Sequence, residues 1–477
     1  MKKFFGSKIL LSVVMTATLY AGGDNFSPRL VGMGRTFTAI SRGLDAVGTN
    51  PANLSLNDRD ATFTFNLIPL GVSAGSDFIN YGIYTDFFTG VPDPQPDNPD
   101  NKSARALTEA DKDKILDLFP GGLSYTQARV GTSPFAFSIQ AGDLGFAFVP
   151  SVQVASNIDL PEGFLGILLK GFKDDPNGTS YNIDNTNISA SAVAEFNLSA
   201  AYLLPVQVPS INEISVGLGV KYFIGLGYTG TERYNSVIET KDVEMYTDEK
   251  GSTYYLPRNI HANIDFLQYF AADTGSSNPS PVGSGLGFDI GVSALVANSI
   301  RVGISVTDIG TMKWDKYTKA IYGRGDITLN GIDPKYGLDD SLTNIFKGKT
   351  VDTTAFEYSL PTALHIGGAM QVDEMITSLP FRWAVAVDMH FGFNNVPGNT
   401  TRPQFSVGTE LDPLTGWLPL RTGIIIGGRQ RFGWSGGFGL HLANTFDLDF
   451  ATQSVALLAY PESFRTLSFV VGMRLRF

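Results

Sequence analysis

The feature that most constrains this chain is a strict alternation of residue types with a period of two. It is clearest over residues 216–228, where every second residue is apolar and most of the intervening residues are glycine. The apolar positions are Val216, Leu218, Val220, Tyr222, Ile224, Leu226 and Tyr228, and Phe223 is the exception on the other face. Because successive side chains of a strand point to opposite faces, this pattern predicts strands with one apolar face and one face of small residues.

The same alternation returns over residues 288–296, 300–306, 381–391 and 469–477. Only residues 297–299 separate the first two of these segments, which is typical of a tight hairpin. A soluble β-sandwich would also alternate, but its solvent face would carry Lys, Glu and Thr, whereas this chain places Gly, Ala and Ser there. We therefore expect an all-β fold, an antiparallel transmembrane β-barrel of about 14 strands over residues 61–477.

Composition supports a barrel and excludes several other classes of protein. The chain has 52 glycines and 17% charged residues, whereas soluble proteins carry about 25%. It has no cysteine, which excludes disulfides, zinc thiolates and thiol nucleophiles. Its net charge of −11 disfavours nucleic acid as a partner.

Both ends of the sequence resemble targeting signals. Residues 1–21 have lysines ahead of an apolar run that is too short to span a bilayer, so we expect a secretory signal peptide. At the other end, Phe469, Met473, Leu475 and Phe477 fall on one face of the last predicted strand. This strand resembles the signal that the barrel-assembly machinery recognises, in which a closing phenylalanine is characteristic.

Residues 22–60, between the signal and the first strand, lack the alternation. Phe37, Ile40 and Leu44 have helical spacing and predict a short amphipathic helix that ends near Gly43. The dipeptide Asn50-Pro51 then predicts a turn, because proline excludes the α conformation from the residue before it.

The run from Gly32 to Leu54 resembles the N-terminal signature of the outer-membrane fatty-acid transporter superfamily, called FadL-like, which also contains PorV-like proteins. The residues that carry the resemblance are Gly32, Gly34, Phe37, Asn50, Pro51, Ala52 and Leu54. The resemblance implies that residues 22–60 form a hatch in the barrel lumen, beside a wall opening for hydrophobic compounds. The same residues suit a purely structural stopper equally well. Residues 107–118 and 308–314 further resemble an uncharacterised outer-membrane family within this superfamily.

Three other segments have local signals. Residues 91–101 are rich in Pro and Asp and are expected to be a solvated loop. Residues 107–118 predict a helix, with Thr108 as N-cap and Asp111 three positions later. Residues 161–170 predict a second loop helix.

No catalytic or cofactor motif has the context that it needs. Residues 433–437 match the G-x-S-x-G pattern, but strand-like alternation follows where a nucleophile elbow needs a helix, so we expect a hairpin turn. The four histidines are far apart in sequence and form no metal-ligand spacing; solvated side chains in the lumen are the default interpretation. We expect no enzymatic activity, no cofactor and no metal.

Two functions remain open for this chain. The first is passive passage of small hydrophobic compounds through the outer membrane, as in FadL-like proteins. The second is a non-transporting scaffold or secretion accessory that binds a partner protein through its loops, as in PorV-like proteins. In both cases the expected location is the outer membrane, and the expected partners include outer-membrane lipid and the barrel-assembly machinery.

Overall fold

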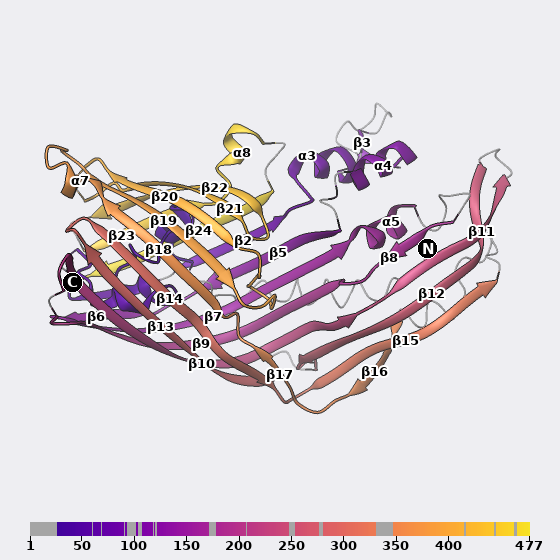
Figure 1. Cartoon of the computed structure of the whole chain (residues 1–477), viewed down its shortest axis with the longest axis horizontal. Coiled ribbons are helices and arrows are strands. Elements are labelled where there is room, and N and C mark those ends of the chain that lie inside the picture. The colour runs from indigo at the N-terminus through magenta and orange to yellow at the C-terminus, as the bar shows by residue number, and fades with distance from the viewer. Residues whose placement is uncertain are drawn as a thin grey trace.

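The computed structural model describes most of the chain from Phe26 to Phe477 (Figure 1). Within this range it leaves out residues 60, 68, 90, 93–101, 104–106, 118, 120–121, 171–177, 207, 248–252, 276–279, 331–346, 415, 443–444 and 462–464. The predicted signal peptide, residues 1–21, and most of the Pro/Asp-rich loop lie outside the described residues.

Antiparallel strands form one closed barrel of 14 strands, which confirms the predicted fold class. Two of the 14 are each broken into two pieces, so we call each of the 14 a stave and the barrel formed by them the ring or wall. In chain order the staves are β1 and β2 together (Phe63–Asn66, Leu70–Ser76), β5 and β6 together (Leu123–Thr132, Phe137–Ala141), β7 (Leu144–Pro161), β9 (Asn187–Leu203), β10 (Ile211–Tyr234), β13 (Gly283–Val296), β14 (Ile300–Trp314), β18 (Ala363–Gln371), β19 (Arg382–Gly392), β20 (Gln404–Asp412), β21 (Leu420–Gly427), β22 (Arg431–Leu442), β23 (Phe446–Thr452) and β24 (Thr466–Arg476). The last stave pairs with the first, with Thr64 opposite Arg476 and Leu70 opposite Val471. Among the described residues, each of the 14 staves therefore pairs with a neighbour on both sides.

The predicted alternation matches the two faces of the ring. On β10, Leu218 is 62% exposed on the outer face, whereas its neighbours Gly217 and Gly219 are buried. Tyr228 is a correction, because the sequence placed it on the outer face and the structure buries it against Trp314. A register shift between Gly225 and Gly227 in the pairing with β9 adds a residue and exchanges the two faces beyond that point.

One side of the ring is much taller than the rest. Beyond β10, β13 and β14 the chain continues into β11 (Val237–Thr247), β12 (Thr253–Ala272) and β15 (Thr318–Asn330), which pair with one another and project to the right in Figure 1. The shorter strands β8 (Ser180–Asn182), β16 (Lys349–Asp352) and β17 (Phe356–Ser359) flank this extension. We call β8, β11, β12, β15 and β16 the wall extension.

Short helices lie in the connections at the end of the ring from which the wall extension projects (Figure 1). They are α3 (Tyr81–Ile83), the π-turn η4 (Tyr84–Phe88), α4 (Glu109–Asp117), α5 (Glu162–Lys170) and α8 (Ala456–Ala459), with a two-residue ladder of β3 (Val91–Pro92) and β4 (Lys102–Ser103). A further short helix, α7 (Val372–Met375), lies at the opposite end. The predicted helices at 107–118 and 161–170 are confirmed, and Thr108 and Asp111 cap α4 reciprocally. Among the described residues, no helix is long and apolar enough to cross a membrane.

The N-terminal segment, residues 26–58, lies inside the ring of strands. Its regular parts are α2 (Pro28–Gly32) and two 3₁₀ turns, η2 (Gly43–Ala46) and η3 (Pro51–Ser55). The amphipathic helix predicted from Phe37, Ile40 and Leu44 is wrong. Gly34 and Arg35 both adopt positive φ, so α2 ends at Gly32 and does not continue into this stretch, and residues 38–40 form a turn.

Glycines of the wall allow this segment to touch the strands backbone to backbone. A Cβ atom on Gly217 would meet the backbone of Pro51 and Ala52, and one on Gly408 would meet Met33. Gly291 and Gly303 leave room for Asn50 in the same way. The small-residue face of the strands is therefore the surface on which the N-terminal segment packs.

We predict that Gly217→Ala lowers the free energy of unfolding by about 1–3 kcal/mol, because the added methyl overlaps the backbone of the segment rather than a movable side chain. Thermal unfolding in detergent, with tryptic cleavage of the segment as a second readout, measures the effect. Gly227→Ala on the same strand is the control, because its nearest neighbour would lie at 3.8 Å. Equal behaviour of the two variants would contradict tight packing at Gly217.

Candidate functional site

A buried carboxylate on the wall holds the middle of the N-terminal segment. Asp388 of β19 accepts hydrogen bonds from the backbone N–H groups of Phe37 and Thr38, at 2.9 and 2.7 Å, and from the Thr38 hydroxyl at 2.8 Å. The two N–H groups belong to an irregular segment that provides no backbone partner for them, and burying them without a partner would be costly. Asp388 therefore positions this bend against the wall.

A chain of ion pairs joins the start of the segment to three strands of the wall, β20, β21 and β23. Arg29 of α2 donates two hydrogen bonds to Glu410, at 2.8 and 2.9 Å. Glu410 also accepts from Arg421 at 2.6 Å, and Arg421 reaches Asp449 at 2.5 Å. Each buried charge has an opposite partner, which compensates for its desolvation.

The last strand provides a second pair of anchors. Arg474 donates to Asp45 of η2, with one contact at 2.9 Å, and Arg476 donates to Asp58 at 2.5 Å. Burial alone would raise the pKa of Asp45, but Arg474 holds it below its usual value. Burial likewise opposes ionisation of Asp58, yet Arg476 and Arg59 lower its pKa to about 2.

All six hatch residues predicted from the sequence lie in the buried N-terminal segment. They are Gly32, Gly34, Phe37, Asn50, Pro51 and Ala52, and all six lie against the wall. Asn50 accepts from the Ala52 N–H at 3.2 Å and donates to the carbonyls of Thr38 and Val292 at 2.9 and 3.2 Å. The amide of Asn50 thus links the turn, a second part of the segment and strand β13.

The four predicted C-terminal residues lie on the outer face of the last strand. Phe469 and Phe477 are 52% and 64% exposed, and Met473 and Leu475 are half-buried between them. Arg474 and Arg476 alternate with them on the inner face. The last strand therefore combines an apolar outer face with an inner face that anchors the N-terminal segment.

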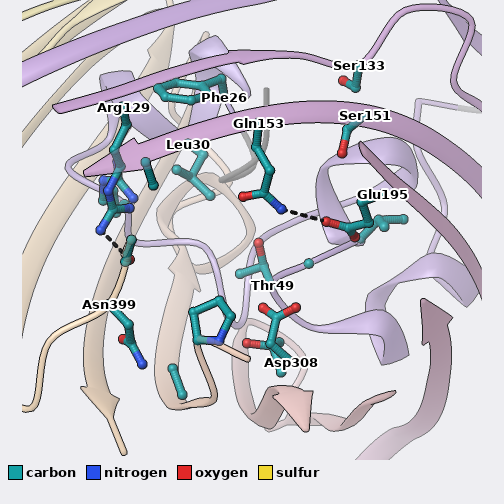
Figure 2. A pocket seen from close by; sticks show the side chains of 18 of the residues that line it. Phe26, Leu30, Thr49, Arg129, Ser133, Ser151, Gln153, Glu195, Asp308 and Asn399 are labelled. Atoms are coloured by element: carbon teal, nitrogen blue, oxygen red, sulfur yellow. Dashed lines mark hydrogen bonds between the residues drawn. The ribbon is translucent and has the colours of Figure 1, made fainter. Parts of the chain in front are cut away.

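A cavity of about 170 Å³ lies between the N-terminal segment and the inner face of the wall. Its apolar lining consists of Phe26, Leu30, Leu44, Val47, Val130, Val149, Val154 and Ile425. Polar side chains line the same cavity (Figure 2). Gln153 donates a hydrogen bond to Glu195 at 3.2 Å, and Arg129 donates one to the Gly398 carbonyl. The cavity therefore offers a mixed surface with a substantial apolar part.

Acidic side chains are concentrated at one part of the cavity lining, and the arginines of the lining, Arg35, Arg129, Arg429 and Arg474, lie outside that group. Lys221 lies 2.7 Å from Asp308, 3.0 Å from Asp289 and 3.8 Å from Glu195. This acidic cluster of one ammonium and three carboxylates has an excess of negative charge. A cation is therefore favoured over an anion beside it.

The ladder between the first two staves is interrupted where the cavity reaches the wall. β1 and β2 are separated by a break that contains Pro69, and β5 and β6 by a break that contains Pro134. Pairing resumes where Thr132 faces Leu70 on one side of the break and, on the other side, at Asn66, which exchanges backbone hydrogen bonds with Phe135 and Ala136. Pro69 and Ser133 line the cavity, so it extends to this interruption.

Two arrangements that resemble chemical sites are accounted for structurally. The G-x-S-x-G run lies within β22, so the expected hairpin turn is wrong; Ser435 is buried and donates to the Gly423 carbonyl.

The second arrangement is a cluster of His441, Asp447 and Asp449, whose side chains converge closely enough to hold a metal ion. However, Arg59 contacts His441 and lies 3.6 Å from Asp447, Arg476 donates to Asp447 and Arg421 donates to Asp449, so each carboxylate already has a guanidinium partner. The predicted solvated histidine is therefore also wrong for His441, which is 2% exposed.

Sequence reasoning did not identify the wall residues that hold the segment. Asp388, Glu410 and Arg421 are charged residues on the small-residue face of a strand. That position was the available signal, because a charge that faces a closed ring needs a partner inside it.

We predict that Asp58→Asn lowers the free energy of unfolding by about 2 kcal/mol at neutral pH. The pKa of Asp58 is lowered in the folded state, so its contribution is present above pH 4 and disappears as the pH falls through 2. Urea unfolding in detergent across this range measures the difference from wild type. Asp143→Asn, in the exposed turn after β6, is the control. A difference that does not depend on pH would contradict the assignment to this ion pair.

Comparison with known proteins gives the following likenesses. The toluene transporter TbuX of Ralstonia pickettii is 13% identical, with a TM-score of 0.43 over 96% of this chain and 100% of that one. The toluene transporter TodX of Pseudomonas putida is 11% identical, with a TM-score of 0.42 over 95% and 98% of the two chains. A FadL homologue of Pseudomonas aeruginosa is 11% identical, with a TM-score of 0.44 over 94% and 98%.

The search among curated proteins gives no match. The likeness to FadL-like transporters is thus one of structure at low identity. Sequence kinship comes from a family model, described as a family of unknown function, DUF5723, which matches residues 51–446. Because this match covers well over half of the chain, the protein belongs to the DUF5723 family.

Proposed function

We propose that this protein is an outer-membrane β-barrel through which small hydrophobic compounds pass passively. The observation that carries the proposal is the partly apolar cavity between the N-terminal segment and the wall, which extends to an interruption of the strand ladder. Compounds would descend from the loop helices to this cavity and leave sideways at the interruption. The N-terminal segment would act as the hatch that closes the direct route.

The outer face of the ring supports a location in a membrane. Large apolar side chains are exposed on consecutive staves, among them Leu198, Leu218, Ile290, Val407 and Leu467. In water such a continuous apolar belt would promote aggregation, whereas in a bilayer it faces acyl chains. Export of the protein by its predicted signal peptide belongs to the same proposal.

The size of the cavity suits small compounds. A dry protein cavity on the order of 150 Å³ accommodates benzene, and this cavity measures about 170 Å³. Transfer of apolar surface from water contributes about 25 cal/mol per Å², so the lining attracts such compounds without a coupled energy source.

A cavity-filling substitution tests the route. We expect Val149→Trp to reduce uptake of a radiolabelled monoaromatic hydrocarbon by cells that express the protein, because the indole occupies the cavity. Val407→Trp, the same substitution on the outer face, is the matched control and should transport like wild type. Uptake at the level of cells without the protein in all three cases would contradict passage.

Deletion tests the hatch separately. Removing residues 22–54 while keeping residues 1–21 should leave a folded barrel, because strand pairing closes the ring without them. In planar bilayers the deletion variant should have a higher single-channel conductance than wild type. Unchanged conductance would show that the N-terminal segment does not block the lumen.

The wall extension supports the alternative function, a scaffold for a partner protein. It reaches well beyond the other strands, in the direction of the loop helices (Figure 1). A stoichiometric protein partner that copurifies with wild type and is lost when residues 237–262 are removed would favour this function. Copurified hydrophobic compounds without such a partner would favour passage.

A further inference from the structure

The fold brings together two histidines that are distant in sequence. His365 of β18 and His390 of β19 are direct partners in the ladder, and both line the cavity. Their Nδ1 atoms are 3.4 Å apart, and their rings meet at 66° with centroids 4.8 Å apart. Both side chains are only partly buried, so the cavity gives access to them.

The distance between the two Nδ1 atoms matches the distance between two nitrogen ligands of one metal ion. Zinc binds imidazole nitrogen at about 2.0–2.1 Å, so two ligands at adjacent corners of a tetrahedron lie about 3.4 Å apart. We propose that His365 and His390 bind one first-row transition-metal ion, such as Zn²⁺, Ni²⁺ or Cu²⁺, through their Nδ1 atoms. Imidazole suits these ions, whereas Mg²⁺ and Ca²⁺ prefer oxygen ligands.

The surroundings of His365 favour this coordination. Its Nε2 lies 3.1 Å from the hydroxyl of Thr307, which is 2% exposed. When Nε2 carries the proton and donates to this hydroxyl, the lone pair of Nδ1 faces His390. Metal-ligating histidines usually donate their other ring N–H in this way, which sets the tautomer and the ring orientation.

The acidic cluster next to Thr307 favours a cation near the two histidines, although four arginines line other parts of the cavity. Thr307 is followed directly by Asp308, which belongs to the acidic cluster with Glu195 and Asp289, and Lys221 is the single cation in that cluster. Among the described residues, His365 and His390 are not part of a converging group of three His, Cys, Asp or Glu ligands. Water or a small solute in the cavity therefore fills the remaining coordination positions.

Metal binding to the full-length protein in detergent, purified without a polyhistidine tag, tests the proposal. Calorimetry with Zn²⁺ should show one ion per chain, and Cu²⁺ should give an electron paramagnetic resonance spectrum with coupling to two nitrogens. His365→Ala and His390→Ala should each weaken binding by roughly tenfold or more, since each removes one of the two protein ligands. His261→Ala is the matched control, because His261 lies on the wall extension, away from the cavity lining.

A second variant separates coordination from a merely structural role. Thr307→Val retains both histidines and should weaken Zn²⁺ binding about 10- to 100-fold, because it removes the group that orients His365. Barrel folding is checked in each variant by heat-dependent migration in gels.

The proposal is overturned if wild type binds no Zn²⁺ at submillimolar concentration, or if His365→Ala and His390→Ala bind like wild type. If the alanine variants do not fold, the nitrogen count of the wild-type Cu²⁺ spectrum decides, and fewer than two coupled nitrogens overturns it. None of these outcomes depends on whether hydrophobic compounds pass through the barrel.

Discussion

The filling of the lumen depends on one close contact, that between the backbone of the N-terminal segment and the inner face of the wall. An irregular segment inside a closed ring brings its own unpaired N–H and C=O groups, and the ring strands have none to spare because they pair with one another. Glycine on the wall brings the two backbones close, and isolated side chains such as Asp388 and Ser215 satisfy the groups that remain. The glycines and the polar side chains on the inner face of the wall are therefore two consequences of the same packing problem.

The charges at this contact are numerous and almost all are paired. Arg29, Arg421, Arg474 and Arg476 bridge carboxylates of the segment and the wall. A buried ion pair contributes little net stability over an apolar pair of the same shape, but breaking it leaves a charge buried without a partner. The network therefore specifies one position of the segment. A segment that slipped by a residue would lose several partners together, whereas an apolar contact would allow a range of positions.

Much of the barrel could be predicted from the sequence, because strands whose two faces meet different surroundings alternate visibly. The assignment of side chains to the outer or inner face failed where a single extra residue shifted all the residues after it. The bulge beyond Gly225 exchanges the faces of β10, and no residue type there announces it. The path of residues 36–42 was missed for a different reason, since Asp388, about 350 positions away, binds the amides of Phe37 and Thr38. The pairing of His365 with His390 is likewise a property of register, which spacing along the chain does not reveal.

The wall extension shows that the ring is more than a membrane-sized cylinder. A strand of about 9–11 residues suffices to cross a bilayer, whereas β10 alone has 24 and β11 continues beyond it. The extension buries an apolar cluster around Ile238, Ile260 and Ile264, and α5 packs against that cluster through Phe164 and Ile167. These apolar side chains are covered by the chain itself, so the extension has its own small core and does not depend on the ring for it. The tall side of the ring is therefore a packed structure in its own right and not a set of frayed strand ends.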